Sequence, residues 1–249
     1  IKNILDKYEI DFYIPLIDEE LIKAKTEFHD YNNVKVLAPT ADFCKLCLNK
    51  FLLMKVLSEL GISNIESYMG DDFEWKNDSA IFVKPISGRG SRGIKRIDSS
   101  KELDAYYILE KYKPEEILIQ ELVVGTEYTI GATVNNLNEI LSISIKRVIR
   151  KKGITQVAVI EGNKVIFDVV GKVVKELKPH GPINIQLYLT PAGEVKIFEI
   201  NPRFSTTTIM SYAAGLDEIE LYVENYDKTY NQEPLQPKFG LTLHRRWES

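Results

Sequence analysis

The chain has 249 residues, 44% of them hydrophobic, and a formal net charge of -4 at pH 7. A chain of this size can bury one large core or several small subdomains, and its slightly negative charge gives no general attraction to nucleic acid or anionic membrane. No apolar stretch is long enough to span a bilayer, so we expect neither a membrane nor a nucleic acid as a partner. The chain begins at Ile1 without a signal-peptide pattern, which we interpret as an internal or trimmed start of a longer protein.

Cysteine and histidine are too sparse to suggest a metal site built from them. The two cysteines, Cys44 and Cys47, form a CxxC pattern, and the three histidines are far apart in the sequence. We interpret the cysteines as reduced, half-buried thiols on a helix, with a functional CxxC as the alternative. Reduced thiols favour a cytoplasmic location.

The first predicted elements are those of a mixed α/β unit. Residues 11–16 read as a short buried strand, an acidic run from Asp18 begins a helix, and residues 34–38 form a second short strand. This order is typical of the end of a Rossmann-like domain whose first half is missing. A helix is then predicted over residues 42–60, with leucines at helical spacing and Gly61 at its end.

From Ile81 onward the pattern changes to strands. Period-2 and short apolar runs predict strands at 81–84, 117–122, 128–134, 139–148, 155–160, 183–189 and 195–200. Helices are predicted at 101–112 and 165–177, and residues 239–247 read as a further strand. The fold class is therefore α+β, largely antiparallel, with an α/β remnant at the front.

A glycine-rich segment follows the strand that ends at Lys84. Gly88, Gly90 and Gly93 allow backbone amides to approach a polyphosphate closely, and Arg89 and Arg92 add positive charge. Lys84 at the strand end favours this interpretation. The segment lacks the Gly-Lys-Ser/Thr ending of a Walker loop. A flexible hairpin is the alternative interpretation.

Residues 119–127 have the pattern of a linker between subdomains. Glu121 is followed by a short apolar run and then by Glu127, so that exposed backbone could bind an adenine edge and carboxylates could bind ribose hydroxyls. A plain strand, turn and strand is the alternative interpretation.

Two neighbouring strands near the end of the chain carry oxygen ligands. Alternation places Asn184 and Gln186 on one face of the first strand, and Glu199 and Asn201 on one face of the second. Carboxylate and amide oxygens suit magnesium, and Arg203 just beyond adds a fork for a phosphate or carboxylate. The alternative is the solvated face of an ordinary hairpin.

Counting from a four-residue turn at 190–193 gives a register for this hairpin. We predict that Asn184 faces Glu199 and that Gln186 lies one diagonal away. The same alternation places Val195 and Ile197 on the face of Glu199, with Phe198 and Ile200 opposite.

A basic run lies in the strand at 139–148 and its tip. We interpret Lys151 and Lys152 as a solvated hairpin tip, and expect Lys146 or Arg147 to face a substrate. A nucleic-acid patch is disfavoured because clustered aromatic residues are missing.

Taken in order, these motifs resemble the ATP-grasp superfamily, with the carbamoyl phosphate synthase large chain and its stand-alone relatives as the nearest likeness. The resemblance covers roughly residues 39–215 and rests on an ordered set, which is more specific than any single member. Its members are Lys50, Lys84, the segment Glu121 to Glu127, Gln186, and Glu199-Ile200-Asn201-Pro202-Arg203.

The resemblance implies an ATP-grasp fold, in which two α+β subdomains grip ATP, preceded by the remnant of a Rossmann-like pre-ATP-grasp domain. The implied division is 1–40 for the end of the pre-ATP-grasp domain, 41–122 for a small lid subdomain, and 123–249 for a large subdomain that holds the metal.

The resemblance also implies roles for single residues. Lys50 and Lys84 would hold the α- and β-phosphates of ATP, and the loop from Gly88 to Gly93 would form a mobile lid. The adenosine would meet Glu121, Leu122, Val123 and Glu127, and the lid contacts would come from Gly88, Gly90, Ser91 and Gly93.

The metal and catalytic residues are implied in the same way. Gln186, Glu199 and Asn201 would hold Mg²⁺, with Mn²⁺ as a substitute, and Arg203 would steady the transferred phosphoryl group together with Lys84 and Asn201. Gln186 stands where many members have an acidic residue, and this lower ligand charge would weaken a second magnesium. Arg89 and Arg92 stand where relatives often have small residues, which predicts a stiffer lid or a lid that touches substrate.

We therefore expect an ADP-forming ligase that joins a small carboxylate to an amine, or to a thiol, through an acyl phosphate. A domain that phosphorylates carbamate or bicarbonate is one alternative, and a nucleotide-binding module without turnover is another. A homodimer is compatible with each of these functions. The sequence does not identify the substrates, because pocket shape decides them.

Overall fold

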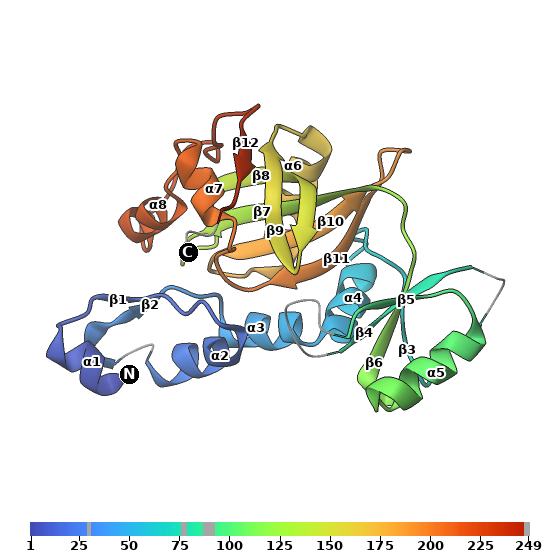
Figure 1. The fold of residues 1–249 in the computed structure, drawn as a ribbon. Coiled ribbons are helices and arrows are strands. Elements are labelled where there is room, and N and C mark those ends of the chain that lie inside the picture. The colour runs from blue at the N-terminus through green and yellow to red at the C-terminus, as the bar shows by residue number, and fades with distance from the viewer. Residues whose placement is uncertain (29–30, 76–78, 87–92, 247–249) are drawn as a thin grey trace.

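The computed structural model describes residues 1–28, 31–75, 79–86 and 93–246. An N-terminal unit and a four-stranded sheet lie side by side beneath a six-stranded sheet, and two helices connect them (Figure 1). This mixture of helices and mainly antiparallel strands confirms the predicted α+β class. The helices in the described part of the chain are all too short or too polar to cross a membrane.

The N-terminal unit contains the predicted strand, helix and strand, and the two short strands pair in parallel. Phe12 lies opposite Lys35, and the helix between the strands buries Leu21 and Ala24 against Val36. The assignment of this unit to a Rossmann-like domain stays a prediction. Its elements are α1 (Lys2–Lys7), β1 (Phe12–Tyr13), α2 (Asp18–Glu27) and β2 (Lys35–Val36).

The helix predicted over residues 42–60 is two helices, α3 (Ala41–Leu48) and α4 (Lys50–Glu59), which corrects the sequence interpretation. The chain breaks at Asn49, whose backbone is extended and whose side-chain oxygen accepts a hydrogen bond from the amide of Leu52 at 3.0 Å. Such a side chain competes with the helical backbone and favours a cap over a helix interior. Lys50 is therefore the first residue of a helix.

Both cysteines lie on α3 and are fully buried, deeper than the half-buried position we expected. Burial raises the pKa of the Cys44 thiol to about 12 and the pKa of Cys47 well above its usual range. Because the thiolate is the reactive form, these are inert core residues.

The small sheet has the strand order β3-β6-β4-β5, with all pairs antiparallel. One face is covered by α5 (Ser100–Glu110), where Leu103 and Tyr106 pack against Val83 and Ile119. Its strands are β3 (Ser67–Met69), β4 (Ile81–Pro85), β5 (Lys95–Ile97) and β6 (Ile117–Glu121).

The large sheet has the order β11-β10-β7-β8-β9-β12 and is antiparallel throughout. Helix α6 (Lys164–Leu177) packs on one face, and the short helices α7 (Thr208–Ala213) and α8 (Glu218–Asn225) lie on the other. The strands are β7 (Thr126–Val134), β8 (Ile140–Lys152), β9 (Ile154–Ile160), β10 (Ile183–Leu189), β11 (Val195–Asn201) and β12 (Thr242–His244). The last of these is shorter than the strand predicted at 239–247.

The core of the large sheet also includes the connecting helices. Phe43 of α3, together with Leu53 and Leu57 of α4, packs in one cluster with Ile185 and Ile197 of the sheet. The segment 41–60, which the predicted division groups with the lid, thus buries its apolar face against the large sheet. The domain boundaries stay a proposal.

The hairpin of β10 and β11 contains a bulge that corrects the predicted register. Asn184 pairs with Asn201 and Gln186 pairs with Glu199, and the register then shifts before Leu187 pairs with Ile197. Leu189 pairs with Val195, and the Thr190 amide bonds to the Glu194 carbonyl at 2.9 Å, so residues 191–193 form the tip of the turn instead of the predicted 190–193.

This bulge also corrects the predicted faces. Val195, Ile197 and Ile200 all lie in the apolar core, while Glu199 is only half-buried. The extra residue at Phe198 shifts the alternation by one, so Glu199 leaves the face of Val195 and joins that of Gln186.

The break at Asn49 gives a test of the fold. We expect Asn49→Ala to lower the free energy of unfolding by about 1 kcal/mol, because α4 loses its side-chain cap. Denaturant unfolding measures this change, and Asn163→Ala, which removes the cap of α6, serves as the comparison. An unchanged midpoint for Asn49→Ala would show that the cap does not hold this helix start.

Candidate functional site

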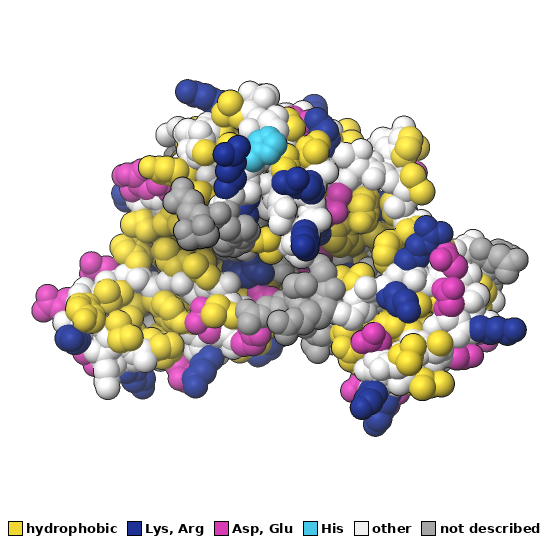
Figure 2. All heavy atoms as spheres, viewed as in Figure 1, with side chains coloured by type: hydrophobic (Ala, Val, Ile, Leu, Met, Phe, Trp, Pro, Cys, Tyr) yellow, Lys and Arg dark blue, Asp and Glu magenta, His cyan; other side chains and the backbone are white. Residues whose placement is uncertain are grey.

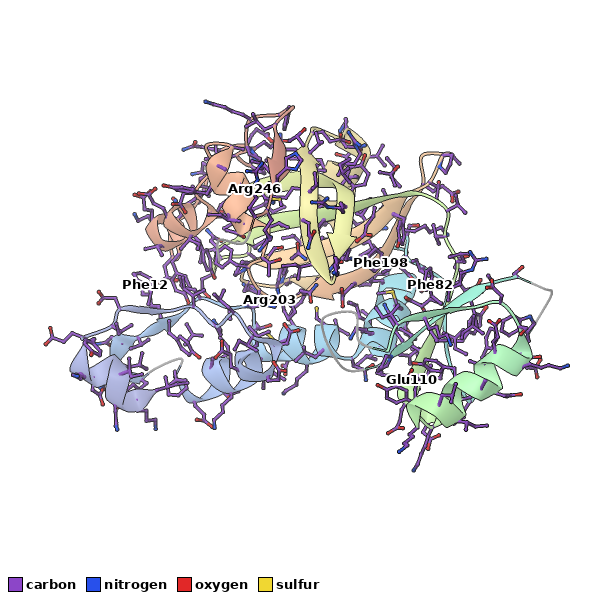
Figure 3. The ribbon with its side chains drawn as sticks, in the orientation of Figure 1. Phe12, Phe82, Glu110, Phe198, Arg203 and Arg246 are labelled. Atoms are coloured by element: carbon purple, nitrogen blue, oxygen red, sulfur yellow. The ribbon has the colours of Figure 1, made fainter. Side chains whose placement is uncertain are left out.

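Lysines from three different elements meet where the small sheet approaches the large one. The Lys84 ammonium of β4 donates a 3.1 Å hydrogen bond to the Phe198 carbonyl of β11 and lies 5.8 Å from the Phe198 ring centre. Lys151, near the end of β8, lies 5.7 Å from the same ring, and Lys50 donates to the Ile86 carbonyl at 3.5 Å. Figure 3 shows Phe198 and Phe82 at this junction.

The electrostatics of this cluster favour an incoming anion. Lys84 is only 7% exposed, and burial lowers its pKa to about 8; Glu199 opposes this shift, whereas the positive charges of Lys50 and Lys151 add to it. Burial likewise lowers the pKa of Lys50, against the attraction of Glu199 and Asp18. A polyphosphate would relieve both the burial cost and the mutual repulsion. On the face shown in Figure 2, Lys and Arg side chains gather at the boundary between the six-stranded sheet and the two parts of the molecule beneath it.

The candidate magnesium ligands are adjacent to these lysines. The Gln186 amide donates to the Glu199 carboxylate at 2.8 Å, and Lys151 donates to Gln186 Oε1 at 3.1 Å and to Glu127 Oε1 at 2.5 Å. Asn201 lies opposite Asn184 at the end of the same hairpin. The hairpin therefore brings Gln186 and Glu199 together, with the ribose candidate Glu127 linked to them through Lys151.

These oxygen ligands suit a hard cation whose remaining coordination positions are filled by phosphate oxygens. Within the described residues, no group of three or more His, Cys, Asp or Glu side chains could hold a metal. One carboxylate with two carboxamide oxygens matches the sparse protein ligation typical of Mg²⁺ at phosphate sites. Gln186 Oε1 accepts from Lys151 here, so a cation and Lys151 would compete for that oxygen.

Arg203 is fixed by the N-terminal unit. Its Nε donates to Asp18 Oδ1 at 2.6 Å and its Nη1 donates to the Phe204 carbonyl at 3.2 Å, and both members of the ion pair are mostly buried. Figure 3 shows Arg203 between the N-terminal unit and the large sheet. Sequence reasoning treated Asp18 as a helix start and missed this contact, because nothing in the sequence links two residues so far apart.

The linker between the sheets can contact a ligand mainly through its backbone. The Glu121 carboxylate accepts from the amide of Glu66 at 3.2 Å and lies 3.8 Å from Lys196, so its side chain is already engaged. Leu122 and Val123 follow in a half-buried stretch that links β6 to β7.

Most of the glycine-rich loop falls outside the described residues, including Gly88, Gly90 and Ser91. Gly93 is described, with φ +69°, and a Cβ there would lie 2.9 Å from Pro85 Cγ. Both the positive φ and this close approach require glycine at the start of the returning strand.

Lys151 and Lys152 lie exposed beside the turn between β8 and β9, which confirms the predicted hairpin tip. Lys151 also bridges Glu127 and Gln186, a contact that the sequence did not predict. Lys146 is fully buried, and Arg147 donates to Glu161 at 2.9 Å. The register of β8 shifts on either side of Arg150, so simple alternation could not place Lys151.

Comparisons with known proteins concern the family and the fold. A sequence profile for the family described as "ATP-grasp in the biosynthetic pathway with Ter operon" matches residues 113–246. The D-alanine--D-alanine ligase of Aquifex aeolicus (strain VF5) is 23% identical over 190 residues, which are 68% of this chain and 65% of that protein.

Solved structures share the fold. The L-amino acid ligase from Bacillus licheniformis has a TM-score of 0.69 at 20% identity, covering 90% of this chain and 58% of that one. The biotin carboxylase from Campylobacter jejuni, described as a complex with beta-gamma-ATP, has a TM-score of 0.77 at 13% identity, covering 96% of this chain and 59% of that one. This chain therefore spans about two thirds or less of the length of these relatives. Because the family profile matches just over half of the chain and these solved structures share its fold, the chain belongs to the ATP-grasp family.

Proposed function

We propose that this chain carries the ATP site of an ADP-forming ligase, which joins a small carboxylate to an amine or a thiol through an acyl phosphate. The observation that carries the proposal is the contact of Lys84 with β11, where it bonds to the Phe198 carbonyl and is attracted by Glu199, which in turn bonds to Gln186. Lys84 comes from the small sheet, and the oxygen ligands proposed for the metal come from the large sheet. The relatives named as D-alanine--D-alanine ligase and L-amino acid ligase support this class of reaction.

In this proposal the nucleotide lies between the sheets. Lys50 and Lys84 bind the α- and β-phosphates, and the loop from Gly88 to Gly93 closes over them. The backbone from Glu121 through Leu122 to Val123 binds adenine, and Glu127 binds the ribose. Because Lys151 bridges Glu127 and Gln186, it releases both when the nucleotide enters and turns to a phosphate oxygen.

Gln186, Glu199 and Asn201 would hold Mg²⁺, or Mn²⁺ in its place. A bound divalent cation supplies charge neutralisation for the transferring phosphoryl group. Arg203 contributes a guanidinium whose Nε and Nη1 are committed to Asp18 and Phe204, which leaves its remaining nitrogen for the phosphoryl or acyl phosphate oxygens. Catalysis is then positioning and electrostatic stabilisation, and no protein nucleophile is needed.

A domain that phosphorylates carbamate or bicarbonate would use the same nucleotide site. The fold likeness to biotin carboxylase is compatible with it, but at 13% identity this likeness concerns the fold alone. We favour the ligase because the curated relative is named as a ligase that joins two amino acids. A homodimer stays a prediction.

The direct test is ADP release from Mg-ATP in the presence of pooled amino acids and small carboxylates. We expect pool-dependent release in the wild type and none in Glu199→Ala, because the carboxylate that orients the metal is gone. Glu194→Ala, at the exposed turn of the same hairpin, is the matched control and should retain turnover. Added hydroxylamine should trap the acyl phosphate as a hydroxamate. ATP binding without release under any pool would instead identify a non-catalytic module.

The lowered pKa of Lys84 predicts how nucleotide affinity depends on pH. Below about pH 8 the free protein already carries the protonated lysine that phosphates favour. Above that pH, binding requires uptake of a proton, so the ATP dissociation constant should rise by up to about tenfold per pH unit. Lys84→Met should bind ATP more weakly and lose this slope. The same slope in the variant would assign it to another group.

The ion pair between Asp18 and Arg203 predicts that the N-terminal unit contributes to turnover. Asp18→Ala should lower kcat by about 10- to 100-fold, because the guanidinium loses the partner that orients it. ATP affinity should change little, and Glu27→Gln at the exposed end of the same helix should behave as wild type. A kcat equal to that of wild type would exclude this orienting role.

A further inference from the structure

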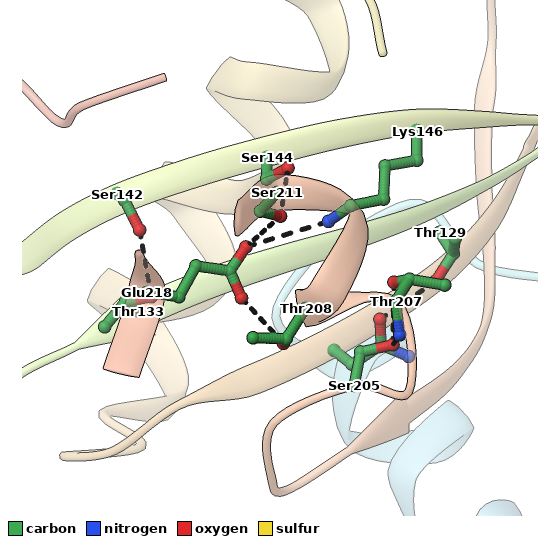
Figure 4. A network of polar contacts seen from close by, with 11 residues as sticks. Thr129, Thr133, Ser142, Ser144, Lys146, Ser205, Thr207, Thr208, Ser211 and Glu218 are labelled. Carbon is green, nitrogen blue, oxygen red and sulfur yellow. Dashed lines mark hydrogen bonds and ion pairs between the residues drawn. The ribbon is translucent and has the colours of Figure 1, made fainter. Parts of the chain in front are cut away.

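A buried polar seam fills the space between the large sheet and the helices α7 and α8 (Figure 4). Its residues come from neighbouring strands and from the C-terminal helices. They are Thr129 and Thr133 of β7, Ser142, Ser144 and Lys146 of β8, Thr208 and Ser211 of α7, and Glu218 of α8. Most of these side chains are fully buried, where unpaired polar groups are costly, so the seam needs a reason beyond packing.

Glu218 is the centre of the seam. Its carboxylate is 2% exposed and accepts from Ser211 Oγ at 2.5 Å and from Thr208 Oγ1 at 2.8 Å. It lies directly over the backbone of β7, because a Cβ at Gly131 would be 3.0 Å from Glu218 Oε1. The carboxylate thus ties both hydroxyls of α7 to the middle of the sheet.

Lys146 supplies the opposite charge. Its side chain is 0% exposed, and its Nζ lies 3.7 Å from Glu218 Oε1 but has no hydrogen-bond partner among the described residues. Burial lowers the pKa of Lys146, and the attraction of Glu218 opposes that shift. A buried pair with such incomplete hydrogen bonding is a poor source of stability, because desolvation offsets the attraction.

The pair connects to the candidate active site at two places. Across the sheet, Lys146 pairs with Thr129, whose hydroxyl donates to Asn184 Oδ1 at 2.9 Å, and Asn184 lies opposite Asn201. Along the chain, Thr208 and Ser211 belong to the segment that follows Arg203.

Helix α8 holds both ends of that segment. Glu218 and Tyr222 lie one turn apart on α8, and both are buried. Glu218 binds Thr208 and Ser211, while the Tyr222 ring contacts the ring of Phe204, next to Arg203, at 5.9 Å between centres. A shift of Glu218 would therefore displace the segment that includes Phe204, whose carbonyl accepts a hydrogen bond from Arg203.

We infer that Lys146 and Glu218 are positioning residues for catalysis, which set the segment 204–211 and through it the guanidinium of Arg203. This inference rests on the proposed function. The buried charges act on geometry: Lys146 neutralises Glu218, and Glu218 fixes α7 against the sheet.

The test compares Lys146→Met, Glu218→Gln and the double variant Lys146→Met/Glu218→Gln. Ser142→Ala is the matched control, since Ser142 is buried on the same strand and bonds to Thr133 at 2.9 Å, away from the segment. Amide hydrogen exchange of residues 204–211 reports the segment, and ADP release with the substrate pool reports turnover. Circular dichroism gives the folded fraction, and Glu218→Gln keeps the shape of the side chain should Lys146→Met fold poorly.

We expect faster exchange in the segment for both single variants, and a kcat per folded molecule that is lower by about 10- to 100-fold, with ATP affinity unchanged. The double variant should recover part of the wild-type exchange protection and part of the wild-type kcat, because it leaves no uncompensated buried charge. Unchanged exchange in both single variants overturns the inference, whatever activity the wild type has. Faster exchange with wild-type kcat overturns it as well. Absence of ADP release in the wild type contradicts the proposed function instead, and the exchange result still decides whether the pair sets the segment.

Discussion

The bulge in β11 is the constraint on which the candidate site depends. Without the extra residue at Phe198, strict alternation would place Glu199 on the face of Val195 and Ile197, inside the apolar core. The shift keeps Ile200 in that core and turns Glu199 toward Gln186, where the two side chains bond at 2.8 Å. The carbonyl of Phe198, the extra residue of the bulge, accepts the hydrogen bond from Lys84, so the bulge lies between the proposed metal ligands and the proposed phosphate-binding lysine.

The lysines of the candidate site already have partners within the protein. Lys84 is buried against a backbone carbonyl and an aromatic ring, and Lys151 donates hydrogen bonds to Glu127 and Gln186. A polyphosphate with its metal would satisfy these groups at once, because the anion would neutralise the lysines and the cation would take the oxygen atoms that Lys151 releases.

Two ion pairs connect the candidate site to the rest of the fold. Asp18 links the start of α2 to Arg203, and Glu218 links α8 to the segment after Arg203 with Lys146 as its counter-charge. Both pairs are largely or fully buried, where geometry is set more firmly than at the surface and where stability gains are small. The N-terminal unit and the C-terminal helices therefore act on the same guanidinium from opposite sides.

The sequence by itself determined the elements and the order of the motifs. Alternation identified β10 and the candidate ligands on it, and the ordered set from Lys50 to Arg203 indicated the ATP-grasp family, because these signals are local. It could not place the helix break at Asn49, the bulge at Phe198 or the contacts of Lys151, since each depends on competition between backbone and side-chain bonds. The tertiary structure decided which distant residues meet: Asp18 with Arg203, Lys84 with Phe198, and Lys146 with Glu218. These pairs form only when separate elements pack, and no spacing along the chain encodes such a distance.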